Sequence, residues 1–222
     1  MKPHRPRTYY RMLKALVKGP LVLLEPEVLK RVRRLKGRVF VDIGANVGLY
    51  TLLLQPRFNR VHAVEPNPEM LAQLKDRVAK HDNVTIHPVA LSDHDGETML
   101  YLNREEAHCS GSADTILPVF NYRPQSNPSM NRSTWQHDGI MVKAVTYDSL
   151  FPGPVDLVKI DVEGAEFLVL YGMRKSLKNG TVKNLVVELH DRERRQELET
   201  LFAQYGYAAR WLDADHLFAW SR

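Results

Sequence analysis

The stretch that decides the fold is Val39-Phe-Val-Asp42-Ile-Gly44-Ala-Asn46-Val-Gly48-Leu-Tyr50-Thr51. An apolar run typical of a buried strand ends in an acid, and a turn with two glycines leads from it into a helical pattern. The glycines lie four residues apart and no Lys follows, which excludes the dinucleotide fingerprint and the phosphate loop. We expect Gly44 and Gly48 to let the backbone approach a ligand closely, and Asp42 favours a cationic ligand over a pyrophosphate.

Two further elements follow the next apolar runs along the chain. Glu65 ends the run 61–64, where an acid is placed to accept both hydroxyls of a ribose that lies across the sheet. Val89-Ala-Leu-Ser92-Asp93 follows the run 84–86, where an adenine edge would arrive. Each element alone is weak evidence, because Glu65 followed by Pro66 is also a plain strand end. In this order, they favour a nucleoside cofactor.

Apolar runs alternate with helical patterns through most of the chain. Strand-like runs occupy 39–41, 61–64, 84–86, 157–160 and 185–187, and helical patterns occupy 67–78 and 191–205. This alternation predicts an α/β fold with a parallel sheet covered on both faces. Residues 208–212 and 217–220 are two further runs joined by a short polar turn, so we expect an antiparallel hairpin there.

Residues 1–38 differ from the rest in charge. They hold 12 Lys or Arg against two Glu, a net charge of +10, whereas the whole chain carries +5. Helical patterns at 9–16 and 26–35 predict a basic helical N-terminal extension, 1–38, ahead of a main domain, 39–222. The apolar stripes of these helices pack on the main domain, or the charges contact RNA or a membrane surface.

Residues 103–139 show no period. Three prolines and scattered Asn and Ser predict a long loop, which we interpret as a substrate lid, between two extra strands at 99–102 and 141–145. His108, Cys109 and His137 lie in this loop, but their spacing is not that of a zinc site.

The composition is that of an ordinary globular chain. With 44% hydrophobic and 26% charged residues among 222, wholesale disorder and fibrous repeats are excluded. No apolar run approaches the roughly 18 residues of a membrane-spanning helix. One cysteine cannot form an intramolecular disulfide, and the N-terminus has no secretory pattern, so we expect a cytoplasmic protein.

These motifs resemble those of the class I S-adenosylmethionine-dependent methyltransferases, and within them the FkbM-type family. The matching segments are 42–51, Glu65-Pro-Asn-Pro68, Ala90-Leu-Ser-Asp93, 145–150, Lys159-Ile-Asp-Val-Glu-Gly-Ala-Glu166 with 169–172, and Val187-Glu-Leu-His190. The resemblance covers roughly residues 39–220. It implies a Rossmann-like sheet that is mostly parallel, with seven strands and the last strand antiparallel.

The resemblance also implies S-adenosylmethionine as the cofactor. The residues expected around it are Asp42, Gly44, Ala45, Asn46, Gly48, Tyr50, Thr51, Glu65, Pro66, Ser92 and Asp161. Members of the family mostly methylate hydroxyls on sugars and other small molecules. We therefore expect an O-methyltransferase with a small-molecule or glycan acceptor.

Methyl transfer to a hydroxyl requires a positioned acceptor and a group that takes its proton. Asp161 ends the fourth strand, Glu163 follows, and Glu188 and His190 end the fifth strand. We expect these four to form a base with an orienting acid, or Asp161 and Glu188 to hold Mg²⁺. Alternatively, Glu163 and Glu166 only cap and solubilise the helix that starts there.

Two other functions stay open at this point. An RNA ribose 2′-O-methyltransferase would bind RNA through residues 1–38, and Lys159, Asp161 and Glu188 partly match the Lys-Asp-Lys-Glu set of such enzymes. A non-catalytic cofactor-binding module would dock on a membrane or a partner, although Asp42, Glu65 and Asp161 together argue against it. The sequence is also compatible with a homo-oligomer.

Overall fold

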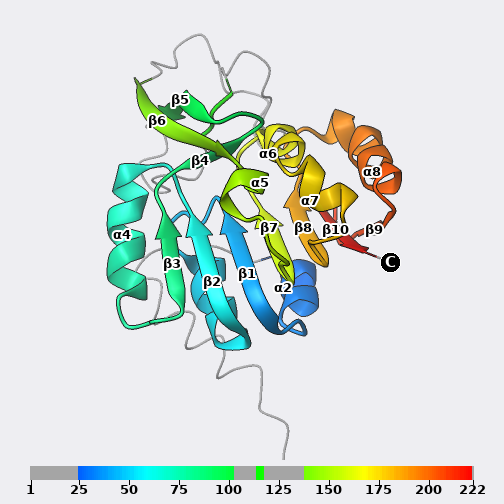
Figure 1. The fold of residues 1–222 in the computed structure, drawn as a ribbon, viewed down its shortest axis with the longest axis horizontal. Helices are drawn as coiled ribbons and strands as arrows, with labels where there is room; N and C mark the ends of the chain where they lie inside the picture. Colours follow the sequence, from blue (N-terminus) through cyan, green and yellow to red (C-terminus); the bar gives the residue numbers. More distant parts are fainter. Residues whose placement is uncertain (1–24, 103–113, 118–137, 222) are drawn as a thin grey trace, which may run out of the picture.

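The computed structural model describes residues 25–102, 114–117 and 138–221. A seven-stranded sheet with the order β3-β2-β1-β7-β8-β10-β9 forms its centre (Figure 1). Its strands are β1 (Gly37–Ile43), β2 (Phe58–Val64), β3 (Val84–His87), β7 (Leu157–Ile160), β8 (Asn184–Glu188), β9 (Tyr207–Trp211) and β10 (His216–Ser221). Neighbours from β3 to β8 pair in parallel, whereas β10 is antiparallel to β8 and β9. The predicted sheet, its antiparallel last strand and the terminal hairpin are confirmed.

Helices cover both faces of this sheet. They are α2 (Pro26–Val32), α3 (Leu49–Leu54), α4 (Pro68–Val78), α5 (Tyr147–Leu150), α6 (Glu166–Gly172), α7 (Arg174–Lys178) and α8 (Arg195–Gln204), with single 3₁₀ turns at Gln55–Arg57 and Arg192–Arg194. Val41 and Ile43 of β1 pack with α5, α6, α7 and α8, whereas Phe40 packs with α2 and α3. Successive side chains of a strand point to opposite faces, so residue parity decides which layer each strand residue enters.

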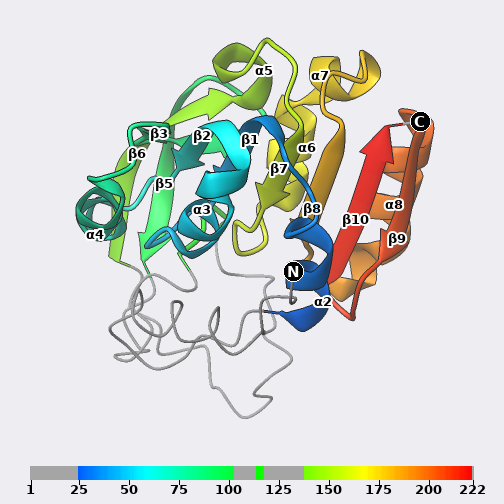
Figure 2. The same cartoon turned by 90° about the horizontal axis from the view of Figure 1, so that it is seen from below.

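The second helix of the predicted extension packs on the sheet. Val28 and Val32 of α2 are buried beside Phe40 and Phe218, and Figure 2 shows α2 next to β10. The interpretation that this apolar stripe packs on the main domain is confirmed. β1 begins at Gly37, a few residues after α2. The apolar side chains of α2 and of this face of the sheet form one hydrophobic layer. The helix predicted at 9–16 lies outside the described residues.

A smaller sheet stands beyond the carboxyl end of the large one. It has the order β4-β6-β5, built from β4 (Ala90–Ser92), β5 (Gly96–Leu102) and β6 (Asp138–Thr146). The antiparallel pairing of β5 with β6 confirms the two extra strands. The loop predicted to reach residue 139 ends earlier, because β6 pairs with β5 from Asp138 onward. Residues 103–113 and 118–137, with His108, Cys109 and His137, lie outside the described residues.

Among the described residues, none of the helices is long and apolar enough to cross a membrane.

Candidate active site

A cavity of about 630 Å³, counted with its open mouth, lies at the carboxyl ends of the parallel strands. Its lining combines apolar side chains with four carboxylates, those of Glu65, Asp114, Asp161 and Glu163. Within the described part of the chain, none of the lining residues is Lys, Arg or His. Carboxylates that focus one sign of charge in a cleft favour a cationic ligand and disfavour phosphates.

The turn after β1 forms one wall of this cavity. Gly44 lines the cavity and adopts φ +75°, and a Cβ there would lie 1.7 Å from the carbonyl oxygen of Asp161. At Gly48, with φ +85°, a Cβ would lie 2.5 Å from Leu74. Both glycines thus make room for the protein's own chain, and the expected close approach of Gly44 to a ligand stays a prediction.

Asp42 does not line the cavity, contrary to the expected contact with a cationic ligand. It points to the same face as Phe40, where its side chain is 1% exposed and accepts a 2.6 Å hydrogen bond from the Thr51 hydroxyl. Burial raises the pKa of Asp42, and the charge of Lys159, its register partner on β7, opposes that shift. The cation beside Asp42 is thus a lysine of the protein.

Other residues expected around the cofactor also lie outside the lining: Ala45, Gly48, Tyr50, Thr51 and Ser92. Tyr50 donates its hydroxyl to Glu25, ahead of α2. Ser92 is buried and donates its hydroxyl to Asp93, while residues 89–91 line the cavity in its place. The segment expected at the adenine thus reaches the cavity through apolar side chains.

Glu65 sits at the cavity with its carboxylate oriented by the backbone. One oxygen accepts from the N–H of Asn46 and the other from the N–H of Asn67, both at 2.8 Å. Asn46 holds φ +49°, a left-handed conformation that Asn tolerates better than most residues. Burial raises the pKa of Glu65 to about 7, and the two N–H groups limit that rise. Pro66 lines the cavity beside it.

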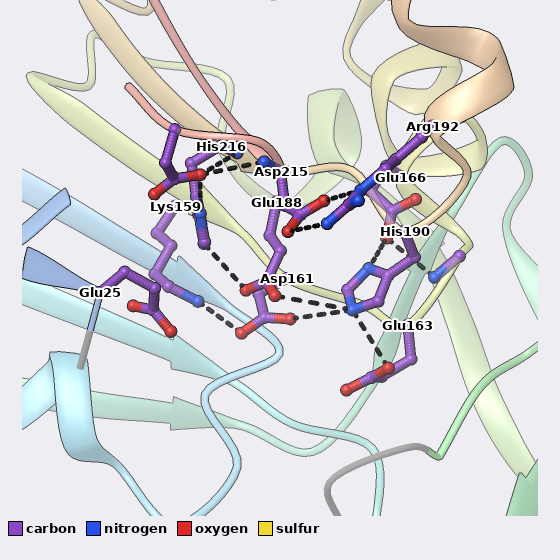
Figure 3. Close-up of polar contacts among 12 residues, drawn as sticks. Glu25, Lys159, Asp161, Glu163, Glu166, Glu188, His190, Arg192, Asp215 and His216 are labelled. Carbon is purple, nitrogen blue, oxygen red and sulfur yellow. Dashed lines mark hydrogen bonds and ion pairs between the residues drawn. The ribbon is translucent and has the colours of Figure 1, made fainter. Parts of the chain in front are cut away.

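Four acids surround His190 above the end of the sheet (Figure 3). Its Nδ1 donates to Glu166 at 2.8 Å, and its Nε2 lies 3.1 Å from Glu163 and 4.0 Å from Asp161. Burial lowers the pKa of His190, but the bonds to Glu163 and Glu166 raise it well above its usual value. The raised pKa favours the charged form of His190, which orients the carboxylates of Glu163 and Glu166.

The alternative interpretation of the two acids near α6 is contradicted for the solvent exposure of Glu166 and stays open for Glu163. Glu166 is 1% exposed and accepts from His190 and from the N–H of Gly164, so it does not solubilise the helix. Glu163 precedes α6 and holds φ +51°, a strained conformation that is enriched at functional sites. Burial raises the pKa of Glu163, with His190 opposing the rise.

Lys159, which does not line the cavity, keeps the carboxylate of Asp161 ionised. The ammonium of Lys159 lies 2.7 Å from Asp161 and 4.7 Å from the centre of the Tyr50 ring. Burial would raise the pKa of Asp161, but Lys159 holds it below its usual value. Burial likewise lowers the pKa of Lys159, and Asp161 and Asp42 more than offset that effect. Asp161 is thus an ionised acid on the cavity wall.

Glu188 stands behind the cavity, between two imidazoles. Its carboxylate lies 3.8 Å from Nε2 of His190 and 3.2 Å from Nε2 of His216. Of the four expected catalytic residues, Asp161 and Glu163 line the cavity, whereas Glu188 and His190 do not. Sequence reasoning missed His216, whose only signal was its place at the start of the last strand, opposite Glu188.

The model of the family described as "Methyltransferase FkbM domain" matches residues 42–209, most of the chain and every described residue that lines the cavity. The chain belongs to the FkbM methyltransferase family. This confirms the resemblance drawn from residues 42–51 and 159–166. The FkbM assignment rests on sequence, and the sheet described above agrees with it.

Two known proteins resemble this FkbM chain. It is 27% identical to the hexuronic acid methyltransferase AglP of Haloferax volcanii over 152 residues, and the alignment covers 68% of this chain and 56% of that protein. The crystal structure of methyltransferase FkbM from Methylobacillus flagellatus KT matches with a TM-score of 0.57 and 16% identity, over 88% of this chain and 48% of that one. The chain thus spans about half the length of these relatives.

Proposed function

We propose that this FkbM-family chain is an S-adenosylmethionine-dependent O-methyltransferase that acts on a hydroxyl of a sugar or another small molecule. The observation that carries the proposal is the cavity with four carboxylates and, among the described residues, no cationic side chain in its lining. When bound, S-adenosylmethionine supplies a methyl group on a positively charged sulfur, and its C–S bond breaks as the acceptor oxygen bonds to the methyl carbon.

The residues present fit this cofactor. Two backbone N–H groups orient Glu65, so its carboxylate can accept ribose hydroxyls without reorganising. Asn46 and Pro66 flank it, and residues 89–91 add apolar surface for a base. Asp161 and Glu163 supply negative charge for a cation at the opposite end.

Glu163 is the proposed general base. It lines the cavity, and the raised pKa caused by its burial makes it a better proton acceptor than Asp161. Its carboxylate takes the proton of the acceptor hydroxyl. His190, held on its other side by Glu166, keeps Glu163 in place. Asp161, bound by Lys159, stays ionised beside the reacting groups.

The expected magnesium pair, Asp161 and Glu188, does not fit a hard cation. The Lys159 ammonium occupies one oxygen of Asp161, and Glu188 faces two imidazoles. An ammonium beside a carboxylate opposes binding of Mg²⁺, which requires near-ideal oxygen ligation. We therefore assign no part of the transfer to magnesium.

A sugar is the proposed acceptor because the curated relative is named a hexuronic acid methyltransferase. Asp161 and Glu163 at the cavity favour a neutral hydroxyl over an ionised carboxylate, which they would repel. The RNA alternative depends on the basic extension, most of which lies outside the described residues, and no observation among the residues described favours it.

The test is transfer of a labelled methyl group to hexoses, hexuronates and their oligosaccharides. We expect an alkali-stable methyl ether, and a fall in kcat of about 100-fold or more for Glu163→Gln at unchanged affinity for S-adenosylhomocysteine. Glu193→Gln, at an exposed position, is the matched control and should keep full activity. A methyl ester as product, or full activity of Glu163→Gln, would contradict the proposal.

A further inference from the structure

Three side chains from separate segments meet on the α2 side of the sheet, behind the cavity. Glu25 precedes α2, Glu188 ends β8 and His216 begins β10. One ligand atom from each lies within 4.8 Å of the others, and none of the three lines the cavity. Figure 3 shows the three on the side of Asp161 where Lys159 lies, away from Glu163.

His216 is arranged as metal-binding histidines are. It is 3% exposed, and its Nδ1 lies 2.9 Å from Asp213, whose same oxygen accepts the backbone N–H of His216 and Asp215. Its Nε2 is buried and makes no hydrogen bond, although a carboxylate oxygen of Glu188 lies 3.2 Å away. Metal-ligating imidazoles almost always have their other ring nitrogen fixed by a carboxylate or a carbonyl in this way.

The spacing and orientation of the carboxylates fit the same interpretation. Two ligand atoms about 2.0–2.2 Å from a tetrahedral ion are about 3.3–3.6 Å apart. The 3.2 Å between His216 and Glu188 is close to the lower end of that range. Glu25 is oriented as well, because its carboxylate accepts the Tyr50 hydroxyl. His216 and Glu25 are therefore each held by a second partner, Asp213 and Tyr50 respectively.

We propose that Glu25, Glu188 and His216 form a binding site for one first-row divalent metal ion of the Zn²⁺ type. One imidazole and two carboxylates suit zinc better than Mg²⁺, which prefers oxygen ligands alone. Three protein ligands leave the fourth tetrahedral position to water. The ion would tie the residue ahead of α2 to β8 and β10. None of its ligands lines the cavity, so metal binding can be measured without methyl transfer.

The test is calorimetric titration of ZnCl₂ into the metal-free full chain, with no cofactor present. We expect wild type to bind zinc with an affinity that falls at least tenfold in Glu25→Gln and is lost in His216→Asn. Zinc should raise the unfolding midpoint of wild type, raise that of Glu25→Gln less at the same zinc concentration, and leave that of His216→Asn unchanged, and millimolar MgCl₂ should not compete. The milder Glu25→Gln keeps the test valid if His216→Asn fails to fold.

His190→Asn is the matched control. His190 also lies among carboxylates, but its Nδ1 donates to Glu166 and its Nε2 faces Glu163 at 3.1 Å. Its replacement should leave zinc affinity within twofold of wild type. Zinc affinity unchanged in Glu25→Gln, or reduced in His190→Asn as much as in His216→Asn, would overturn the proposal. Competition by Mg²⁺ at equal concentration would overturn the assigned metal class.

Discussion

Asp42 and Glu65 stand at the ends of two adjacent parallel strands, yet their surroundings are opposite. Asp42 points into the layer below α3, where Thr51 and Lys159 satisfy it. Glu65 follows the last residue of β2 and faces the cavity, where two backbone N–H groups hold its carboxylate. An acid at the end of a strand therefore contributes to stability or to ligand binding according to the face of the sheet that its side chain enters.

Removal of the cation beside Asp42 should change stability the most. Lys159→Met leaves Asp42 and Asp161 without their cation, so the free energy of unfolding should fall by about 3–5 kcal/mol. Lys183→Met is the matched control: Lys183 pairs with Asp156 at 2.6 Å but is 56% exposed, so we expect a loss below about 1 kcal/mol. Urea denaturation measures both, and equal losses would show that Lys159 does not support the buried acids.

The next effect concerns the turn that separates the two acids. Gly44→Ala places a methyl group against the carbonyl of Asp161 at a positive φ, so we expect a loss of about 3 kcal/mol or more. Gly180→Ala shares the positive φ, +61°, but its Cβ meets nothing within 4 Å, and should cost about 1–2 kcal/mol. Thermal unfolding of the pair isolates the clash, and similar midpoints would remove the packing argument for Gly44.

A smaller effect concerns the cavity side. The pKa of Glu65 is raised by burial from 4.5 to about 7, so the folded state binds the extra proton between these values. Stability from this group is present below pH 4.5 and is lost as pH rises to about 7, by an amount on the order of 3 kcal/mol. Glu65→Gln should remove this pH dependence.

Unfolding from pH 4 to pH 8 measures the difference between wild type and Glu65→Gln. Glu97→Gln, an exposed acid on β5, controls for the loss of a carboxylate as such. A constant difference between wild type and Glu65→Gln across this range would contradict the burial of Glu65.

Affinity for S-adenosylhomocysteine should rise with pH through about 7 in wild type, because the ionised carboxylate is the better hydrogen-bond acceptor.

Much of the fold followed from the sequence because it depends on local periodicity. The alternating runs, the capped helix after Asn67 and the terminal hairpin are all confirmed. Glu65, Asp161 and Glu163 reach one cavity because the carboxyl ends of parallel strands meet at one edge. Asp42 and Ser92 were placed by the position of their motif, which does not reveal the face that each side chain enters.

The residues that sequence analysis missed depend on long-range pairing. His216 meets Glu188 only through the register of β10 against β8, and Glu25 reaches them because α2 packs on the same face. The position of Glu166 is typical of a solvent-exposed acid in a first helical turn, but the structure buries its side chain and pairs it with His190. No local pattern contains these relations.

The most direct test of the cavity's role is calorimetric titration of S-adenosylhomocysteine into the full chain. We predict one site per chain in wild type, and at least a tenfold loss of affinity for Glu65→Ala, because Glu65 is the oriented acceptor at the cavity. Asp93→Ala, outside the lining, should bind as wild type does. No binding by wild type, or equal binding by Glu65→Ala, would contradict the assignment of this cavity to the cofactor.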